Sequence, residues 1–219
     1  MIIDMHVHTN ISGDSSATVE QYCSIIQKFR QYYPFDGIVL TEHCRYDREI
    51  SYQNIGEKYG LSIFQGVEAD TDLGHLLLYG ITDRFLEEVD ISRKNLSSQK
   101  VIKTINDCGG IGIPAHPFRA SNYGSALMNH DEALNDIKVI EELNGSNTSD
   151  EDSKATALIR QTDIKGIGGS DAHYVNRLWF LNCATEFFNG VHTIEDLVEA
   201  LRQGDFRAVS LDSSALGEF

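Results

Sequence analysis

Two histidines, His6 and His8, stand one residue apart near the start of the chain, in the segment IIDMHVHTNISGDSS. Alternate side chains of an extended strand point to the same face, so we expect these two imidazoles to point the same way. Asp14 follows in the Gly/Ser-rich end of the same segment. Two imidazoles on one face can share a metal ion, and they can equally pack side by side in a core. The remainder of the chain has to decide between these interpretations.

Four more histidine motifs follow, namely TEH, GHLLLYG, AHPFR and DAH, and Glu68 lies in the motif GVEAD. A lone histidine is more often a core residue than a ligand, but six histidines in short polar motifs with three carboxylates fit that interpretation poorly. Imidazole and carboxylate together suit Zn, Mn or Fe. Because nine ligands exceed what one ion uses, we expect two or three divalent ions. The further candidates are His43, Glu68, His75, His116, Asp171 and His173.

These residues fall at the ends of predicted strands. Short apolar strands alternate with amphipathic helices, which favours an α/β fold with a parallel sheet. In barrels of parallel strands the active site lies at the carboxyl ends of the strands. His75 is the exception, because it stands at the start of its strand. We predict strands over 2–8, 35–43, 61–70, 74–81, 111–118, 136–145, 164–173 and 206–211, and helices from about 18 and over 98–110, 152–163 and 191–204.

Composition limits the function classes. The chain has 219 residues, of which 41% are hydrophobic, enough for one sizeable core. A net charge of −15 disfavours binding to duplex nucleic acid. We expect no signal peptide and no membrane span. The four scattered cysteines indicate reduced thiols and a cytoplasmic protein. The pattern does not predict the oligomeric state.

In their order, these motifs resemble those of the PHP family (polymerase and histidinol phosphatase), whose members are metal-dependent phosphoesterases. The resemblance runs from DMHVH to GGSDAH, which is most of the chain, and includes five separate motifs. HVH alone also opens many amidohydrolases and would be a weak signal. The resemblance implies a distorted (β/α)7 TIM-like barrel, with 1–219 as a single PHP-type metallohydrolase domain. Family relatives often carry an inserted cap, but the short stretch over 81–112 predicts no separate cap domain here.

The resemblance also implies a trinuclear metal centre in which Glu68 bridges two ions. One departure is TEH, where the family more often has TDH, and we expect Glu42 to orient a ligand. Glu141 matches a recurrent family glutamate, for which we expect a structural role at its strand end. The implied ligands of the three ions, in turn, are His6, His8, Glu68 and Asp171; Glu68, His75 and His116; and Asp14, His43 and His173.

The expected reaction is hydrolysis of a small phosphate ester. Two neighbouring cations acidify a bridging water, and the resulting hydroxide attacks phosphorus while the ions neutralise the phosphate oxygens. We expect Glu68, Asp171 and His173 to be catalytic; His173 or a water could protonate the leaving group, and a third ion could equally stabilise it. Arg119 could bind the phosphate as a bidentate fork; its alternative is an ion pair with a loop carboxylate. For Arg45 and Arg177 substrate binding and a surface role stay open.

Two other functions remain open. An amidohydrolase would also use HVH and a late aspartate, but GVEAD, AHPFR and DAH fit it less well. A non-catalytic scaffold would be expected to lose ligands, and all nine positions here hold competent ones. Among phosphate esters, nucleotides, sugar phosphates and short oligonucleotide ends are all possible substrates. His130 and His192 lie in loop-like or cap-like sequence, and we expect them to be surface residues.

Overall fold

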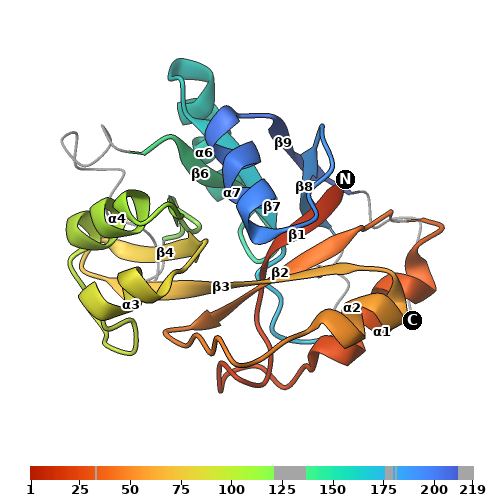
Figure 1. Cartoon of the computed structure of the whole chain (residues 1–219). Helices are drawn as coiled ribbons and strands as arrows, with labels where there is room; N and C mark the ends of the chain where they lie inside the picture. The colour runs from red at the N-terminus through yellow and green to blue at the C-terminus, as the bar shows by residue number, and fades with distance from the viewer. Residues whose placement is uncertain (33, 121–136, 176–179, 181, 212–219) are drawn as a thin grey trace.

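The structure is a computed structural model that describes residues 1–32, 34–120, 137–175, 180 and 182–211. Figure 1 shows helices placed around a strongly curled sheet. Arg177, a candidate substrate-binding residue, and His130, an expected surface residue, lie outside the described residues. The elements are β1 (Ile2–Val7), α1 (Val19–Phe29), β2 (Gly37–His43), α2 (Gln53–Tyr59), β3 (Ser62–Thr71), β4 (Gly74–Tyr79), α3 (Asp83–Glu88), α4 (Ser98–Asp107), β5 (Ile111–Pro114), β6 (Val139–Asn144), α6 (Ser149–Gln161), β7 (Lys165–Gly169), β8 (Cys183–Phe187), α7 (Ile194–Gln203) and β9 (Phe206–Ser210).

The main sheet has seven strands in the order β5-β4-β3-β2-β1-β8-β9, and β6 and β7 form a second, two-stranded sheet. The α/β class is confirmed. The expectation of a parallel sheet was wrong in part: β1, β2 and β3 are parallel, but β4 is antiparallel to both β3 and β5, and β8 is antiparallel to both β1 and β9. The reason is a tight connection between β3 and β4, which is too short for the crossover that parallel neighbours need.

The two sheets meet along β1. The first half of β1 pairs with β8, through Ile2 and Glu186. At its other end, Val7 forms a parallel bridge to Ala172, just beyond β7, and the Asp171 N–H donates to the His6 carbonyl at 2.7 Å. The edge of β1 is therefore divided between two strands. This division curls the sheet into part of a barrel and brings the segment after β7 beside the histidines of β1.

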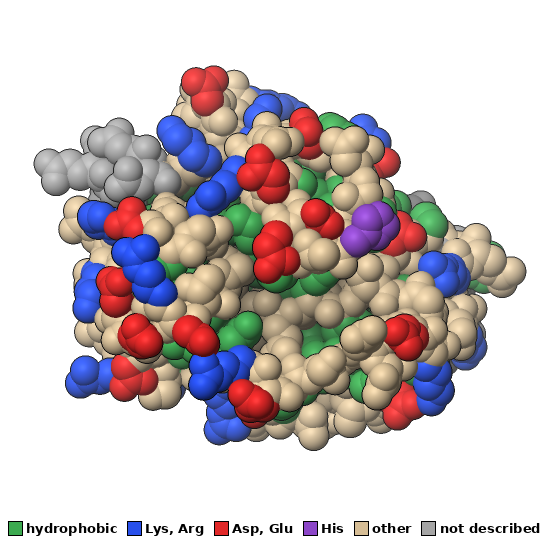
Figure 2. Space-filling model, in the orientation of Figure 1, with side chains coloured by type: hydrophobic (Ala, Val, Ile, Leu, Met, Phe, Trp, Pro, Cys, Tyr) green, Lys and Arg blue, Asp and Glu red, His purple; other side chains and the backbone are tan. Residues whose placement is uncertain are grey.

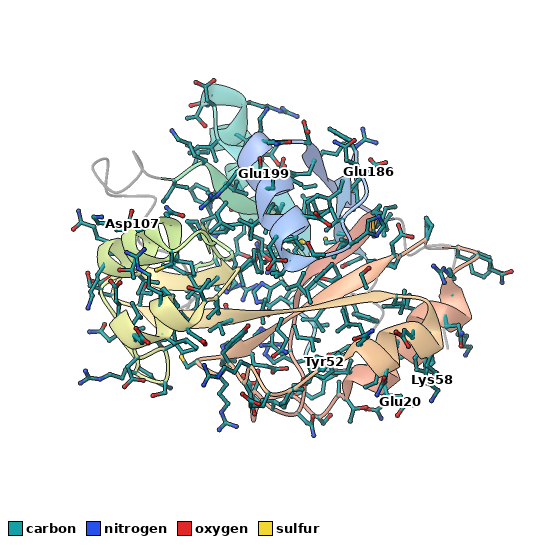
Figure 3. The ribbon with its side chains drawn as sticks, viewed as in Figure 1. Glu20, Tyr52, Lys58, Asp107, Glu186 and Glu199 are labelled. Carbon is teal, nitrogen blue, oxygen red and sulfur yellow. The ribbon has the colours of Figure 1, made fainter. Side chains whose placement is uncertain are left out.

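Local sequence signals position the helices. Thr18 and Gln21 form the predicted capping box at the start of α1. Thr193 caps α7, which ends at Gly204 in the left-handed conformation, with φ of +78°. Lys58 of α2 pairs with Glu20 of α1, both labelled in Figure 3, and this contact ties the two helices together on the surface.

Three apolar clusters hold the fold together. One lies between β1, β5, β7 and α7; a second joins α1 to the outer side of β1 and β2; a third packs α3, α4 and α6 against β4 and β6. Buried Tyr22 of the second cluster donates its hydroxyl to the carbonyls of His8 and Ala172, both at 2.9 Å. One helix side chain thereby fixes the ends of two strands that carry candidate ligands.

Residues 81–112 form α3, a loop, α4 and the start of β5. Val101, Ile102 and Ile105 of α4 are buried in the third cluster, so this segment packs on the sheet. The absence of a separate cap domain stays a prediction. Among the residues that the structure describes, no helix combines the length and the apolar character needed to cross a lipid bilayer.

Candidate metal centre

Four predicted ligands converge at the end of β1. The Nε2 atoms of His6 and His8 lie 3.0 Å apart. Glu68 Oε2 lies 3.4 Å from the first and 3.2 Å from the second. Asp171 Oδ1 lies 3.5 and 3.4 Å from the same two nitrogens. All four side chains are buried. The set corresponds to the ligands expected for the first ion.

Glu68 faces two groups of histidines with its two oxygens. Oε1 lies 2.8 Å from Nδ1 of His75 and 2.9 Å from Nε2 of His116, while Oε2 faces His6 and His8. One carboxylate therefore lies between the first and second predicted ligand sets. Its burial is nearly complete, at 1% exposure.

The third predicted set is more open. Asp14 Oδ2 lies 3.2 Å from Nε2 of His43 and 3.4 Å from Nε2 of His173. Asp14 is 52% exposed, so the loop that carries it faces solvent. His43 differs from a simple third-set ligand, because its other nitrogen, Nδ1, lies 3.0 Å from Glu68 Oε2. The ring of His43 could therefore serve either set.

The antiparallel course of β4 explains the exceptional position of His75. In the register of β3 and β4, His75 stands opposite Asp70, two residues beyond Glu68. The start of β4 therefore lies at the same edge as the end of β3. The expected parallel direction of this strand was wrong, and the antiparallel direction places His75 beside the other candidate ligands.

Hydrogen bonds assign the tautomers of the two central histidines. The carboxylate Oε1 of Glu141 lies 2.9 Å from Nδ1 of His6, and a carboxylate only accepts, so Nδ1 carries the hydrogen. His8 Nδ1 lies 3.2 Å from Ser12 Oγ, whose single hydrogen is donated to Glu42 at 2.5 Å. Nδ1 of His8 is therefore the donor to Ser12. In both neutral rings the lone pair is on Nε2.

The neutral tautomers leave electron-pair donors facing one another. The Nε2 lone pairs of His6 and His8 and the oxygens of Glu68 and Asp171 share one small space. Glu68 Oε2 is buried and has no hydrogen-bond partner among the described residues. Such a set needs a cation at its centre. The residues present fit divalent metal ions, and the His/Glu groups of this cluster have the spacing of metal ligands.

The pKa values of the metal-free protein are consistent with a need for positive charge among these ligands. Burial lowers the pKa of His6, but the carboxylates of Glu141, Asp171 and Glu68 outweigh it and raise the value well above normal. Burial also lowers the pKa of His8, but the carboxylates of Asp171 and Glu68 outweigh it and raise the value to about 9. Burial also opposes ionisation of Glu68, but neighbouring histidines hold its pKa well below normal. Without metal, protons take the place of the cation.

Unusual backbone conformations gather around the site. Cys44, His116 and Asp171 have positive φ angles of 52°, 32° and 53°. Non-glycine residues rarely adopt this region, and their strain is held by surrounding structure. Two of the three are candidate ligands, and the third directly follows His43. Tertiary contacts therefore hold these residues in strained backbone conformations that direct their side chains toward the site.

Glu42 and Ser12 organise the loop after β1. Glu42 accepts hydrogen bonds from the Thr9 N–H and hydroxyl and from Ser12, and Ser12 Oγ also accepts the His43 N–H at 3.0 Å. Ser12 thus touches both His8 and His43. We expected Glu42 to orient a ligand, and it reaches His8 through Ser12. Ser12 itself was missed, because a serine in a Gly/Ser loop carries no distinguishing signal.

The cluster lines a cavity of about 730 Å³. Arg119 lies in its wall, 18% exposed, and its Nη2 donates to Asp171 Oδ2 and to Asn144, both at 2.8 Å. Arg45 is exposed at the rim and donates to the Ile11 carbonyl. Lys94, which sequence reasoning did not single out, also lines the cavity. These three cationic side chains therefore line the cavity that holds the candidate ligands.

Comparison with known proteins begins with a family profile. PHP_C, described as PHP-associated, matches residues 151–206, which include most of α6, and β7, Asp171, His173 and α7. No curated protein sequence matches the chain. The family-profile match lies partly beyond the motifs used above and includes two candidate ligands. The resemblance to the PHP family is confirmed.

Solved structures share the fold. A two-domain protein from Bacteroides vulgatus, predicted to contain a PHP-like metal-dependent phosphoesterase, is 17% identical with a TM-score of 0.64; the match covers 95% of this chain and 64% of that one. PsfC from Pseudomonas syringae is 17% identical, with a TM-score of 0.69 and 97% and 91% coverage. An amidohydrolase from Chromobacterium violaceum with bound sulfate is 16% identical, with a TM-score of 0.58 and 78% and 87% coverage. This chain therefore spans less than two thirds of the first of these proteins.

Proposed function

We propose that the protein is a metal-dependent phosphoesterase that hydrolyses small phosphate esters. The observation that carries the proposal is the position of Glu68, whose two oxygens face two separate histidine groups at 2.8 to 3.4 Å. A protein predicted to be a PHP-like metal-dependent phosphoesterase shares the fold. Divalent ions held there would act as Lewis acids on phosphate oxygens and lower the pKa of water enough to make it a nucleophile.

The proposed ligands divide among three ions as the family resemblance implies. Glu68 would bind both the first and the second ion, and Asp171 would complete the ligands of the first. The more exposed group around Asp14 would bind the third, where His43 turns one nitrogen toward each neighbouring carboxylate. We propose Zn, Mn or Fe, because the ligands are imidazoles and carboxylates without thiolate.

The side chains around the cavity orient the substrate. Arg119 steadies Asp171 through its outer oxygen and, as a cavity-lining cation, attracts a phosphate group. Lys94 and Arg45 add positive charge at the rim. His173 donates its Nδ1 hydrogen to the Asp171 carbonyl at 3.0 Å, so its Nε2 is free to bind a metal or to exchange a proton with the leaving group. Its pKa is lowered by burial and by His8.

A small substrate fits the charge of the protein better than a polymer does. The net charge of −15 repels a long polyanion, whereas a single phosphate can be bound by local cations. Figure 2 shows acidic and basic side chains interspersed over one face. We therefore propose no binding to duplex nucleic acid.

The test is phosphate release from nucleotide, sugar and amino-alcohol phosphates after reconstitution with Mn, Zn or Fe. Release that is abolished by a chelator and by Glu68→Gln, but retained in Glu199→Gln, supports the proposal. Glu199 is an exposed carboxylate of α7 that lies outside the cluster and lines none of the neighbouring cavities, so it controls for general effects of the same substitution. Metal binding without release from any ester would reject it.

Amide hydrolysis is the second candidate, because a protein described as an amidohydrolase shares the fold at a TM-score of 0.58. The same metal-loaded preparations should be assayed on amides. Activity on amides with none on phosphate esters would replace the first proposal by the second.

A further inference from the structure

A second cavity adjoins the candidate metal centre. It measures about 500 Å³ and shares Cys44, Arg45 and Ser92 with the cavity of the metal centre. Since it opens beside the ligands, a group attached to a phosphate at the metal centre could extend into it. We call this cavity the apolar subsite; its further lining residues are Ile11, Leu40, Glu42, Tyr46, Asp47, Ile50, Tyr52, Gln65, Gly66, Leu86, Val89, Asp90 and Ile91.

The wall between the two cavities is the segment that follows α3. Val89 and Ile91 are buried and line the apolar subsite, whereas Lys94 lines only the metal-centre cavity. The end of β3 fixes this segment in place, because the Asn95 N–H donates to Asp70 Oδ1 at 2.7 Å and Leu96 forms a β-bridge with Thr71. One wall thus presents a cation to one cavity and aliphatic side chains to the other.

Three polar side chains of the apolar subsite, those of Asp47, Asp90 and Gln65, are already engaged in their own loops. Asp47 accepts the Glu49 N–H, Asp90 accepts both the N–H and the hydroxyl of Ser92, and the Gln65 amide donates to the Ile50 carbonyl. A sugar would bring many hydroxyl groups into this space and would find few unpaired partners. The lining therefore favours an apolar group over a polyol.

Charge disfavours a second phosphate. The described lining contains three carboxylates, Glu42, Asp47 and Asp90, and one guanidinium, Arg45. A second anionic group placed there would meet net negative charge. The charge of the lining therefore disfavours an anionic group at the end of the substrate that lies away from the metal centre.

The groove does not end at this cavity. A further cavity of about 660 Å³ shares Tyr46, Ile50, Tyr52 and Gln65 with the apolar subsite and runs along β3 toward the start of α7. Tyr52, labelled in Figure 3, directly precedes α2 at this junction and makes no side-chain capping hydrogen bond. Figure 2 shows the face hollowed in its middle, with hydrophobic side chains in the floor. An apolar group longer than one ring has room.

We infer that the substrate is a phosphate monoester of an uncharged, apolar alcohol, whose phosphate lies at the metal centre and whose apolar group lies in the apolar subsite. The inference rests on the proposed function for the phosphate end. It excludes bisphosphates, oligonucleotide ends and simple sugar phosphates as preferred substrates.

Binding of two phosphonates to the metal-loaded protein tests the inference without requiring turnover. We expect 2-phenylethylphosphonate to bind at least about tenfold more tightly than ethylphosphonate, because burial of the ring adds apolar contact. Calorimetric titration measures both affinities. Ile50→Asp, which places a charge in the half-buried wall, should abolish the difference and leave ethylphosphonate affinity unchanged.

The control is Ile25→Asp, since Ile25 is also a half-buried isoleucine but lines none of these three cavities. Metal content and thermal melting of both variants establish that they are folded. Equal affinities of the two phosphonates for the wild type would overturn the apolar subsite alone. If neither phosphonate binds, the phosphate site and the inference both fail. Preferential binding without hydrolysis of the matching ester would support the subsite and count against the proposed catalysis.

Discussion

Glu141 Oε1 lies 2.9 Å from Nδ1 of His6, and the other oxygen of Glu141 accepts the backbone N–H of His116 at 2.6 Å. One buried carboxylate thereby orients a ring of β1 and a loop after β5. Sequence reasoning gave Glu141 a structural role at its strand end. The geometry makes it the partner that sets the tautomer of His6 and aims its Nε2 at the proposed first ion.

We expect Glu141→Gln to weaken metal binding about 10–100-fold, the usual cost of losing such a partner. The amide fills the same space but has one acceptor oxygen where Glu141 uses two, so the loss reports on the hydrogen bonds to His6 and His116 rather than on packing. Metal titration followed by competition with a chelator measures the affinity. Glu142→Gln is the matched control, because the neighbouring carboxylate instead accepts the Thr156 hydroxyl. Equal effects of the two substitutions would contradict the assignment.

Glu68→Gln should remove more metal than the loss of any single-set ligand, because one carboxylate faces both the first and the second ligand sets. Metal content per chain, measured by elemental analysis after dialysis, should fall by about two ions if three are bound. Replacement of His75 by alanine should affect the second set alone. A full metal complement with near-normal turnover in Glu68→Gln would mean that this carboxylate does not bridge.

Metal binding should release protons at neutral pH. The pKa of His8 is about 9 in the metal-free protein and that of His6 is raised, so both rings are charged there, whereas a metal takes the neutral imidazole. Affinity should therefore rise with pH up to about 9. Calorimetry in two buffers of different ionisation enthalpy counts the protons. If metal binding released no protons near pH 7.5, the raised pKa values of His6 and His8 would be contradicted.

The same shift predicts how stability depends on pH. The folded-state pKa of His8, about 9, lies above the ordinary histidine value of 6.5, so the stabilising charge is fully present below pH 6.5 and is lost as pH rises toward about 9. The melting temperature of the metal-free protein should fall across this range. The metal-loaded protein should not show that fall, because its imidazoles stay neutral. Parallel melting curves of the two forms would contradict the prediction.

Gly169→Ala should disturb His6 directly. A Cβ added at Gly169 would lie 2.5 Å from the His6 Cβ and 2.8 Å from its backbone nitrogen, which cannot turn away. We expect a loss of about 1–3 kcal/mol of stability and a lower metal affinity. Gly112→Ala is the control, since the nearest neighbour of its added Cβ is the Cγ2 methyl of Ile105 at 3.3 Å, a looser contact than either of those at Gly169. Chemical denaturation compares the two variants.

Arg119→Ala should leave the metal content intact and raise KM for phosphate esters about tenfold. Asp171 loses its ion pair but remains near Asn144, whose amide lies 3.5 Å away, so the carboxylate keeps a neighbour on that side. Steady-state kinetics and elemental analysis separate the two effects. Loss of metal in place of a raised KM would show that Arg119 only supports Asp171.

The sequence by itself predicted the identity of the candidate ligands. Each of the nine lies within 3.5 Å of another member of the set, although they come from segments spread between residues 6 and 173. Their types and their places at strand ends carried this information, because the metal chemistry limits the residue types and the edge of a sheet limits their positions. Helix starts such as Thr18 were also predictable, because a cap depends on residues three positions apart.

The way in which those residues meet could not be predicted from the sequence, because it depends on tertiary contacts. The direction of β4, the division of β1 between β8 and the segment after β7, and the positive φ of His116 and Asp171 depend on contacts between distant segments. Sequence reasoning did not predict the roles of Ser12 and Lys94 or the apolar subsite for the same reason, since a loop residue acquires its role from what folds against it. Local patterns predict which atoms can bind a cation, whereas long-range packing determines where the lone pairs point and which walls enclose the substrate.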